Sequence, residues 1–371
     1  MDASSSPSDS SPVLTEIPRH PDAMDQGAEP GSLAGSARNN ILLFALTLLT
    51  TTMAGAYMAG ANLSLEAPLA SLVALGSGLS FSIPLMLILL AHEMGHYVTA
   101  RRCGVDVSLP YFIPAPFPSY FFLGTFGAFI RMRAVPRSRK AMFDIGAAGP
   151  WAGFIVAAVF LAYGLRQSEI GPLDNSAGGL NLGNSMLFWG IGRLVLGVNP
   201  SSVNVSLSPE AFAGWLGFFV TTLNLLPVGQ LDGGHVIYAL FGQRHRTISR
   251  LFILLCLMMV LVPLLIGGEY WPGWLLWVGL LVVLGLGHPT TLDANTPLDR
   301  GRTVAAWLTV ALFVLTFSPV PFYYTEPAAQ PSEKTYEVIT PAPVPAHPRA
   351  RMCSTRAGLD WTVGKGGVFG A

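Results

Sequence analysis

Charged residues are scarce in this 371-residue chain: Asp, Glu, Lys and Arg make up only 11% of it, and their formal charges cancel at pH 7. A protein that binds nucleic acid through its phosphates carries an excess of basic residues, so this balance excludes a strongly basic nucleic-acid binder. Hydrophobic residues, in contrast, make up 51% of the sequence. That combination is typical of a protein embedded in a lipid bilayer.

Cysteines are also few, and none is paired with a second one at short spacing: Cys103, Cys256 and Cys353. They predict neither a disulfide framework nor a cysteine-ligated zinc site. Residues 1–39 are rich in Ser, Pro and acids and lack both the basic start and the apolar centre of a signal peptide. Transit peptides are poor in acids, so we expect neither import signal here but a disordered tail.

Seven apolar segments follow that are long enough, or nearly long enough, to cross a bilayer. They are residues 40–60, 80–101, 143–165, 209–226, 251–267, 271–287 and 303–317. If each crosses once, most Arg and Lys residues fall on the side of the amino terminus, which the positive-inside rule makes cytoplasmic. We therefore predict an all-α polytopic membrane protein with about seven transmembrane helices. Its parts are a disordered tail (1–39), a membrane-embedded domain (40–320) and a second disordered tail (321–371).

Three stretches between these segments differ from them. Residues 61–79 are apolar but broken by Pro and Gly, and they form either a short re-entrant helix or an extension of the next helix. Residues 104–142 hold too many Pro and Gly for a helix, but LGTFGAFIRMR predicts a strand or small β-hairpin, and the basic residues around it place it facing the cytoplasm. Residues 166–208 contain one amphipathic helix, at 184–197, and are too short for an inserted globular domain.

The segment HEMGH, residues 92–96, carries the clearest chemical signal. Residues four apart lie on one face of a helix, so His92 and His96 can share a metal ion while Glu93 reaches a water molecule on it. The helix that holds them is roughly 31 Å long, enough to span a bilayer. Two histidines and a glutamate at that depth are costly unless they face a cavity, a partner or a metal, which favours a metal site over a solvated helix face.

A catalytic zinc ion has three protein ligands and a water, so a third ligand must come from elsewhere. The candidates inside apolar segments are Asp144, Asp232, His235 and His288. We favour Asp232, because Pro227 and several Gly break the chain next to it, and broken backbone at membrane depth is tolerated only against protein or a wet cavity. Zn²⁺, two neutral histidines, a carboxylate and a hydroxide also sum to zero charge.

Alternative roles stay open for several of these residues. Asp232 can instead cap a helix that begins at Gly233, and His235 can either hydrogen-bond Asp232 or simply pack. Asn224 can donate to a developing oxyanion, or it can bond carbonyls that Pro227 frees. Asp144 lies close enough to the basic loop to pair with an Arg.

The residues of the predicted strand are expected to meet substrate. Gly124, Thr125, Phe126 and Gly127 would offer a free edge that pairs with an unwound substrate segment; the alternative is a hairpin that only plugs the cavity. The small residues of GAAGPWAG, 146–153, should let their helix approach a neighbour closely. The gap between that helix and segment 209–226 is the entrance we expect.

On these motifs the chain resembles the site-2 protease family of intramembrane zinc metalloproteases. The resemblance rests on HEMGH, SLPYFIPAPF, GTFGAFIRMR, FDIGAAGPWAG and LNLLPVGQLDGGH, and spans roughly residues 80–320. The sequences of these motifs are most similar to those of a subgroup that includes plant chloroplast members and their bacterial relatives. The chain departs from well-known bacterial members, since it has no room for a PDZ domain between its central spans.

The resemblance implies zinc held by His92, His96 and Asp232, with Glu93 activating the water and Asn224 near the cleft. It also implies hydrolysis of a membrane-spanning protein segment, as in regulated intramembrane proteolysis. The rival hypotheses are a metal or proton transporter and an inactive membrane scaffold. We expect a transmembrane protein substrate and the bilayer as partners, no nucleic acid, and a multi-pass protein of a bacterial cytoplasmic membrane, favoured over a plastid one because the amino terminus is acidic.

Overall fold

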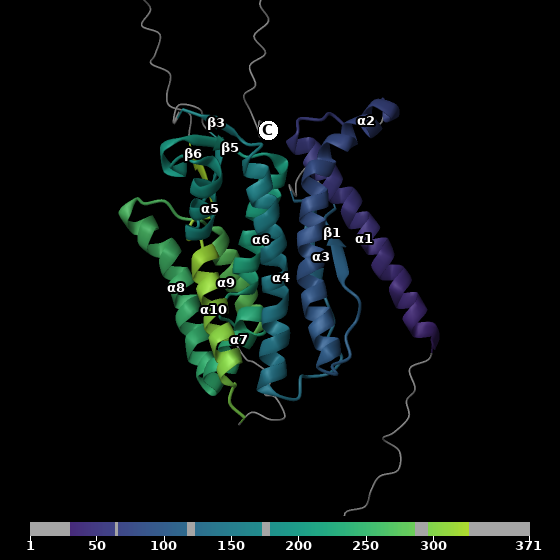
Figure 1. The fold of residues 1–371 in the computed structure, drawn as a ribbon. Helices are drawn as coiled ribbons and strands as arrows, with labels where there is room; N and C mark the ends of the chain where they lie inside the picture. The colour runs from purple at the N-terminus through teal and green to yellow at the C-terminus, as the bar shows by residue number, and fades with distance from the viewer. Residues whose placement is uncertain (1–29, 64–65, 117–122, 173–178, 286–295, 326–371) are drawn as a thin grey trace, which may run out of the picture. The chain divides into compact units, whose positions relative to one another are not determined.

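The computed structural model describes residues 30–63, 66–116, 123–172, 179–285 and 296–325 (Figure 1). Contacts divide the chain into two units, Met1–Asn39 and Asn40–Ala371, and the site lies in the second. The candidate ligand His288 falls outside the described residues.

The described residues are mostly helical, as the sequence predicts. The α-helices are α1 (Pro30–Met58), α2 (Pro68–Leu75), α3 (Leu79–Arg102), α4 (Arg139–Leu165), α5 (Met186–Leu196), α6 (Pro209–Asn224), α7 (Asp232–Phe241), α8 (His245–Ile266), α9 (Gly273–Leu284) and α10 (Arg300–Thr316). Short 3-10 turns join α2 to α3 (Gly76–Gly78) and α7 to α8 (Gly242–Arg244), and a third precedes β5 (Pro200–Ser202). The expected amphipathic helix at 184–197 corresponds to α5.

Four of these helical stretches are long and apolar enough to cross a membrane: Ala37–Met58, Pro68–Arg102, Arg139–Leu165 and Asp232–Ile266. The second joins α2 to α3, so residues 68–79 extend the helix that carries HEMGH, one of the two alternatives for this stretch. Three other expected spans correspond to α6, α9 and α10, which have 16, 12 and 17 residues. At ~1.5 Å per residue each is shorter than a ~30 Å hydrocarbon layer, so helix length alone supports four spans.

The expected β-hairpin is present, and the side of the membrane that it faces stays a prediction. Strands β1 (Tyr111–Pro114) and β2 (Thr125–Phe129) pair antiparallel, with a register shift between Phe112 and Pro114. The Asn40 side-chain amide donates to the carbonyls of residues 109 and 110, and the Thr50 hydroxyl donates to the Gly124 carbonyl at 2.6 Å. The hairpin thus runs along α1 as far as the middle of a candidate span, where these polar contacts satisfy its backbone.

Two further antiparallel strand pairs were not predicted. Strand β3 (Glu169–Gly171) pairs with β5 (Asn204–Ser206), and β4 (Gly179–Leu182) pairs with β6 (Phe322–Thr325). The second pair lies partly in the segment expected to be a tail. The paired strands have three or four residues each, too few for a clear alternation of hydrophobic and polar residues.

Helix α4 packs against both α3 and α6, and these three helices lie side by side in Figure 1. The close approach expected of its small residues is confirmed: a Cβ at Gly95 of α3 would lie 2.5 Å from the Ala148 carbonyl oxygen. On the α6 side, a Cβ at Gly214 would lie 2.5 Å from the Leu161 backbone nitrogen. Backbones this close leave no passage between α4 and α6 at the level of Leu161 and Gly214. The expected entrance between these helices stays a prediction for the rest of their length.

Candidate metal centre

The HEMGH segment lies just beyond the middle of α3 and inside the protein. His92, Glu93 and His96 are buried, with 4%, 6% and 7% of their surface exposed. The one proline inside α3, Pro84, precedes His92 by eight residues, so the backbone hydrogen bond that it removes lies before the motif. The helix is therefore continuous through the motif and holds the two imidazoles on one face.

The LDGG segment brings Asp232 to these imidazoles. Asp232 is the first residue of α7, and the residue in the capping position is Leu231, so the alternative role of Asp232 as helix cap is wrong. The two glycines that follow let α7 begin directly on the preceding loop. A Cβ at Gly233 would lie 2.0 Å from the Leu225 carbonyl oxygen, and one at Gly234 would lie 2.3 Å from that of Gly229.

Three potential ligand atoms meet at this point. His92 Nε2 and His96 Nε2 are 3.1 Å apart, and Asp232 Oδ2 lies 3.3 Å from the first and 3.2 Å from the second. Zinc bonds of ~2.0–2.1 Å in tetrahedral geometry would place such donors roughly 3.3 Å apart. The three side chains therefore fit a zinc ion, and among the described residues they form the single cluster of this kind.

The ring of His96 is held from α4. Its Nδ1 lies 2.8 Å from the Ile145 carbonyl oxygen, which requires a proton on Nδ1 and leaves the Nε2 lone pair for a metal. The ring lies against the backbone of α4 because residue 149 has no side chain: a Cβ there would be 2.0 Å from His96 Nε2. At His92 the same helix presents Gly153, whose Cβ would lie 3.0 Å from the His92 Cβ.

Asn224, at the end of α6, lies beside the same atoms. Its side-chain amide nitrogen is 3.2 Å from His92 Nε2. The amide therefore points to the space where His92 and Asp232 face each other, which favours a role at the centre over bonding to carbonyls near Pro227.

The hairpin reaches Glu93. The backbone of Ile130, the residue after β2, lies beside the Glu93 carboxylate. The four residues expected to meet substrate divide into two kinds. Gly124 and Thr125 anchor the strand, because Gly124 (φ +69°) packs on Thr50 and the Thr125 hydroxyl donates to the Ile113 carbonyl.

Phe126 and Gly127 lie beyond that anchor. The Phe126 side chain is 55% exposed, and Gly127 has a φ of +96°, a conformation that glycine adopts without strain. Within the described residues, β1 is the single strand that pairs with β2.

The other acids and histidines considered as ligands lie apart from this cluster. Asp144 forms an ion pair, as expected, but its partner is Arg302 at the start of α10, at 2.7 Å, rather than an Arg of the basic loop. His235 is buried on α7, where its Cβ faces Gly146 of α4.

One group at the site was not predicted: the Ile145 carbonyl. It is a backbone group of an apolar residue, and motifs of side chains do not reveal such a group. The cluster of small residues at 146–153 was the available signal, because a helix that others approach closely also exposes its carbonyls to their side chains.

Comparison with known proteins agrees with this geometry. Residues 80–267, just over half of the chain, match the model of Peptidase family M50. The chain is similar to "Probable zinc metalloprotease EGY2, chloroplastic" of Arabidopsis thaliana, with 26% identity over 86% of this chain and 54% of that protein. It is also similar to "Probable zinc metalloprotease EGY1, chloroplastic" of Oryza sativa subsp. japonica, with 32% identity over 67% of this chain and 41% of that protein.

The chain thus spans about half the length of the curated relatives it matches. No solved structure matches it significantly. The chloroplastic descriptions of these relatives run against the expected bacterial membrane, an expectation that rested mainly on the acidic amino terminus. The expected resemblance to site-2 proteases is confirmed: the chain has apolar helices able to span a membrane and a set of residues able to hold zinc, and it belongs to Peptidase family M50.

Proposed function

We propose that this protein is a zinc metalloendopeptidase that hydrolyses a peptide bond within, or at the edge of, a membrane-spanning segment of another protein. The observation that carries the proposal is the triangle of His92 Nε2, His96 Nε2 and Asp232 Oδ2, with sides of 3.1–3.3 Å, on helices long and apolar enough to cross a bilayer. Family membership and the relatives described as probable zinc metalloproteases support it.

Each polar residue at the centre has a distinct role in this proposal. His92, His96 and Asp232 hold the zinc ion, whose chemistry at such a site is to polarise a carbonyl and lower the pKa of water. Glu93 accepts the proton from the attacking water and delivers it to the leaving amine. Asn224 donates a hydrogen bond to the oxygen that becomes negative as the water adds to the carbonyl.

The free edge of β2 is the proposed binding site for the substrate. A peptide bond in a helix is shielded by helical hydrogen bonds, so the substrate must unwind, and its exposed backbone groups then need partners. Pairing with β2 satisfies them with little sequence selection. Because the chain leaves β2 at Ile130, whose backbone lies beside Glu93, a segment paired with this strand would extend to the proposed base.

The membrane topology completes the proposal. We infer that α6, α9 and α10 cross together with the four longer helices, because each is apolar and packs on them, and because a helix shielded by its neighbours need not match the full bilayer thickness. The basic ends of α3 and α10 and the start of α4 lie on one side, the side from which water enters. Regulated proteolysis follows if the substrate carries a signalling domain.

A transporter is the less suitable alternative. A conduction path needs polar residues at steps across the bilayer. The described residues hold a single group of three or more His, Cys, Asp or Glu side chains close enough to share an ion. An inactive scaffold is disfavoured because both histidines, the glutamate and the aspartate are all present in the chain.

The test compares cleavage of a membrane-segment reporter by purified wild-type protein and by Glu93→Gln in detergent. Glu93→Gln keeps the shape of the side chain but cannot accept the proton, so we expect cleavage to fall by at least ~100-fold, within the range for a general base. Zinc binding should persist in this variant.

Glu169→Gln is the matched control, because Glu169 is an exposed carboxylate on β3, away from the cluster. It should cleave like wild type. Equal cleavage by wild type and Glu93→Gln, or a wild-type protein that binds zinc and cleaves no membrane segment, would contradict the proposal.

A further inference from the structure

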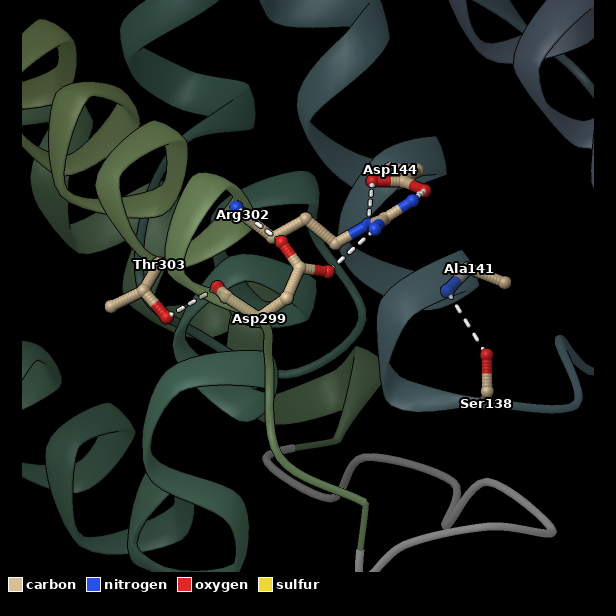
Figure 2. A network of polar contacts seen from close by, with 6 residues as sticks. All are labelled: Ser138, Ala141, Asp144, Asp299, Arg302 and Thr303. Carbon is tan, nitrogen blue, oxygen red and sulfur yellow. Dashed lines mark hydrogen bonds and ion pairs between the residues drawn. The ribbon is translucent and has the colours of Figure 1, made fainter.

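Helix α10 begins beyond the residues that match the family model, and none of its side chains belongs to the metal cluster. Its first turn nevertheless carries Arg302, which forms ion pairs with both Asp144 and Asp299 (Figure 2). Arg302 donates from Nε and Nη2 to the two oxygens of Asp144 at 2.7–3.1 Å, and from Nη1 to Asp299 at 2.6 Å. A two-pronged contact of this kind fixes direction as well as distance.

The same group also fixes the start of α10. Asp299 caps the helix, since its Oδ1 accepts from the Arg302 backbone N–H, and the Thr303 hydroxyl donates to the Asp299 carbonyl. Figure 2 shows Asp299 and Asp144 on two sides of the guanidinium. Arg302 is therefore tied at once to its own helix and to α4.

A second contact joins α10 to α4 seven residues further along both helices. The Trp151 indole N–H donates to the Thr309 hydroxyl at 2.9 Å. Between the two contacts, Ala147 and Ala306 are buried in one apolar cluster. Two contacts with equal spacing on both helices show that α4 and α10 run in the same direction with a fixed register.

The residues of α4 that contact α10 lie opposite those that contact the histidines. At 100° per residue, Asp144, Ala147 and Trp151 share one side of the helix. Gly146, Gly149 and Gly153 lie on roughly the other side, against His235, His96 and His92. A Cβ at residue 149 would lie 2.0 Å from His96 Nε2, so a rotation of α4 that turned Ala148 or Pro150 toward the ring would displace it. The orientation of α4 therefore determines whether the ring can stay where it is.

Asp144 also directly precedes Ile145, whose carbonyl accepts the hydrogen bond from His96 Nδ1. We propose that Arg302 is a positioning residue for the metal centre: by holding Asp144, it sets the register of α4 that presents the Ile145 carbonyl to His96 and the glycine face to both histidine rings. The inference rests on the proposed function, because it gives α10 a role in positioning the groups of that same metal centre. It predicts that a side chain distant from the ligands controls zinc affinity.

The experiment measures zinc affinity by competition with a chelator, and the visible spectrum of the cobalt(II)-loaded form, in the full chain purified in detergent. Arg302→Met and Asp144→Asn should each weaken zinc binding about 10-fold, the lower end of the loss seen when a group that orients a ligand is removed. The double variant should bind zinc no more weakly than either single variant, since both remove one interaction. The cobalt spectrum of each should differ from that of wild type.

Arg300→Met is the matched control, because it removes the same charge from an exposed position two residues away. It should bind zinc like wild type. Arg302→Lys, which keeps the charge and is the variant least prone to misfold, should recover part of the affinity lost in Arg302→Met. Wild-type zinc affinity in Arg302→Met, additive losses in the double variant, or an equal loss in Arg300→Met would overturn the inference.

Reporter cleavage by wild type separates this outcome from failure of the proposed function. If wild type cleaves and Arg302→Met binds zinc normally, the positioning role is wrong and the protease assignment stands. If wild type binds zinc, Arg302→Met binds it about 10-fold more weakly, and neither cleaves, the protease assignment is wrong and the positioning role stands. A wild-type protein without zinc affinity overturns both.

Discussion

The two faces of α4 use opposite means to hold their neighbours. Toward α3 the helix offers Gly149 and Gly153, and the imidazoles lie against its backbone with no room for a methyl group at position 149. Toward α10 it offers the carboxylate of Asp144 and the indole of Trp151, each in a directional hydrogen bond. The first face lets the imidazoles pack closely because it lacks side chains. The second face holds α10 because two of its side chains form hydrogen bonds. Substitutions on the first should therefore act by steric clash and those on the second by loss of a bond.

The largest effect is expected from Gly149→Ala. The new Cβ would lie 2.0 Å from His96 Nε2 and 2.3 Å from Cδ2, so the ring must leave its position and lose the Ile145 carbonyl. We expect at least ~100-fold weaker zinc binding, loss of cleavage, and a free energy of unfolding lower by about 1–3 kcal/mol, as for other overpacked cores. Chelator competition and thermal unfolding measure both quantities.

Gly279→Ala is the control for this experiment. Gly279 also lies inside a helix, α9, but nothing lies within 4 Å of the position of its Cβ. Gly279→Ala should leave zinc binding unchanged and stabilise α9 by up to about 1 kcal/mol. If Gly149→Ala behaved like Gly279→Ala, the glycine face would have no steric role.

A smaller effect is expected from Gly153→Ala. Its Cβ would lie 3.0 Å from the His92 Cβ and 3.2 Å from Nδ1, so a shift of a few tenths of an ångström relieves the contact. We expect zinc affinity to fall about 3-fold to 10-fold, at or below the lower limit for groups that orient a ligand. The same competition assay checks it, and a loss as large as that of Gly149→Ala would remove the distinction between a clash with a ring atom and a looser contact.

The smallest effect belongs to the other face. Thr309→Val keeps the shape of residue 309 but removes the acceptor for the Trp151 indole N–H. A buried donor left without its partner costs about 1–3 kcal/mol of unfolding free energy. Zinc affinity should change by less than about 3-fold, because the Arg302 contact still holds the register. Thermal unfolding measures the first quantity; an effect on zinc larger than that of Arg302→Met would reverse the order proposed for the two contacts.

The same contrast explains which parts of the molecule the sequence could predict. The histidines and Glu93 were predictable because helical spacing alone places residues four apart on one face. Asp232 lies 136 residues from His96, and only the scarcity of acids in apolar segments, together with the broken backbone at Pro227, singled it out. The small residues of α4 predicted close helix packing, which is confirmed. They did not reveal that the neighbours are the imidazole rings.

The features that sequence reasoning did not find depend on contacts between distant segments. The hairpin itself was predicted, but no local pattern indicates that the amide of Asn40 and the hydroxyl of Thr50 hold it along α1. Asp144 was expected to pair with an Arg, and nothing in the local sequence selects Arg302, 158 residues away, over the arginines nearby. The Ile145 carbonyl could not be found from the sequence because every residue has one.

The most direct test of the central claim is the metal content and X-ray absorption spectrum of the purified full chain and of Asp232→Asn. We predict one zinc ion per chain in the wild type, with only nitrogen and oxygen neighbours at ~2.0–2.1 Å and the scattering pattern of two imidazoles. Asp232→Asn should lose most of the zinc. A sulfur neighbour at ~2.3 Å, or an unchanged zinc site in Asp232→Asn, would contradict the assignment of His92, His96 and Asp232 as the ligands.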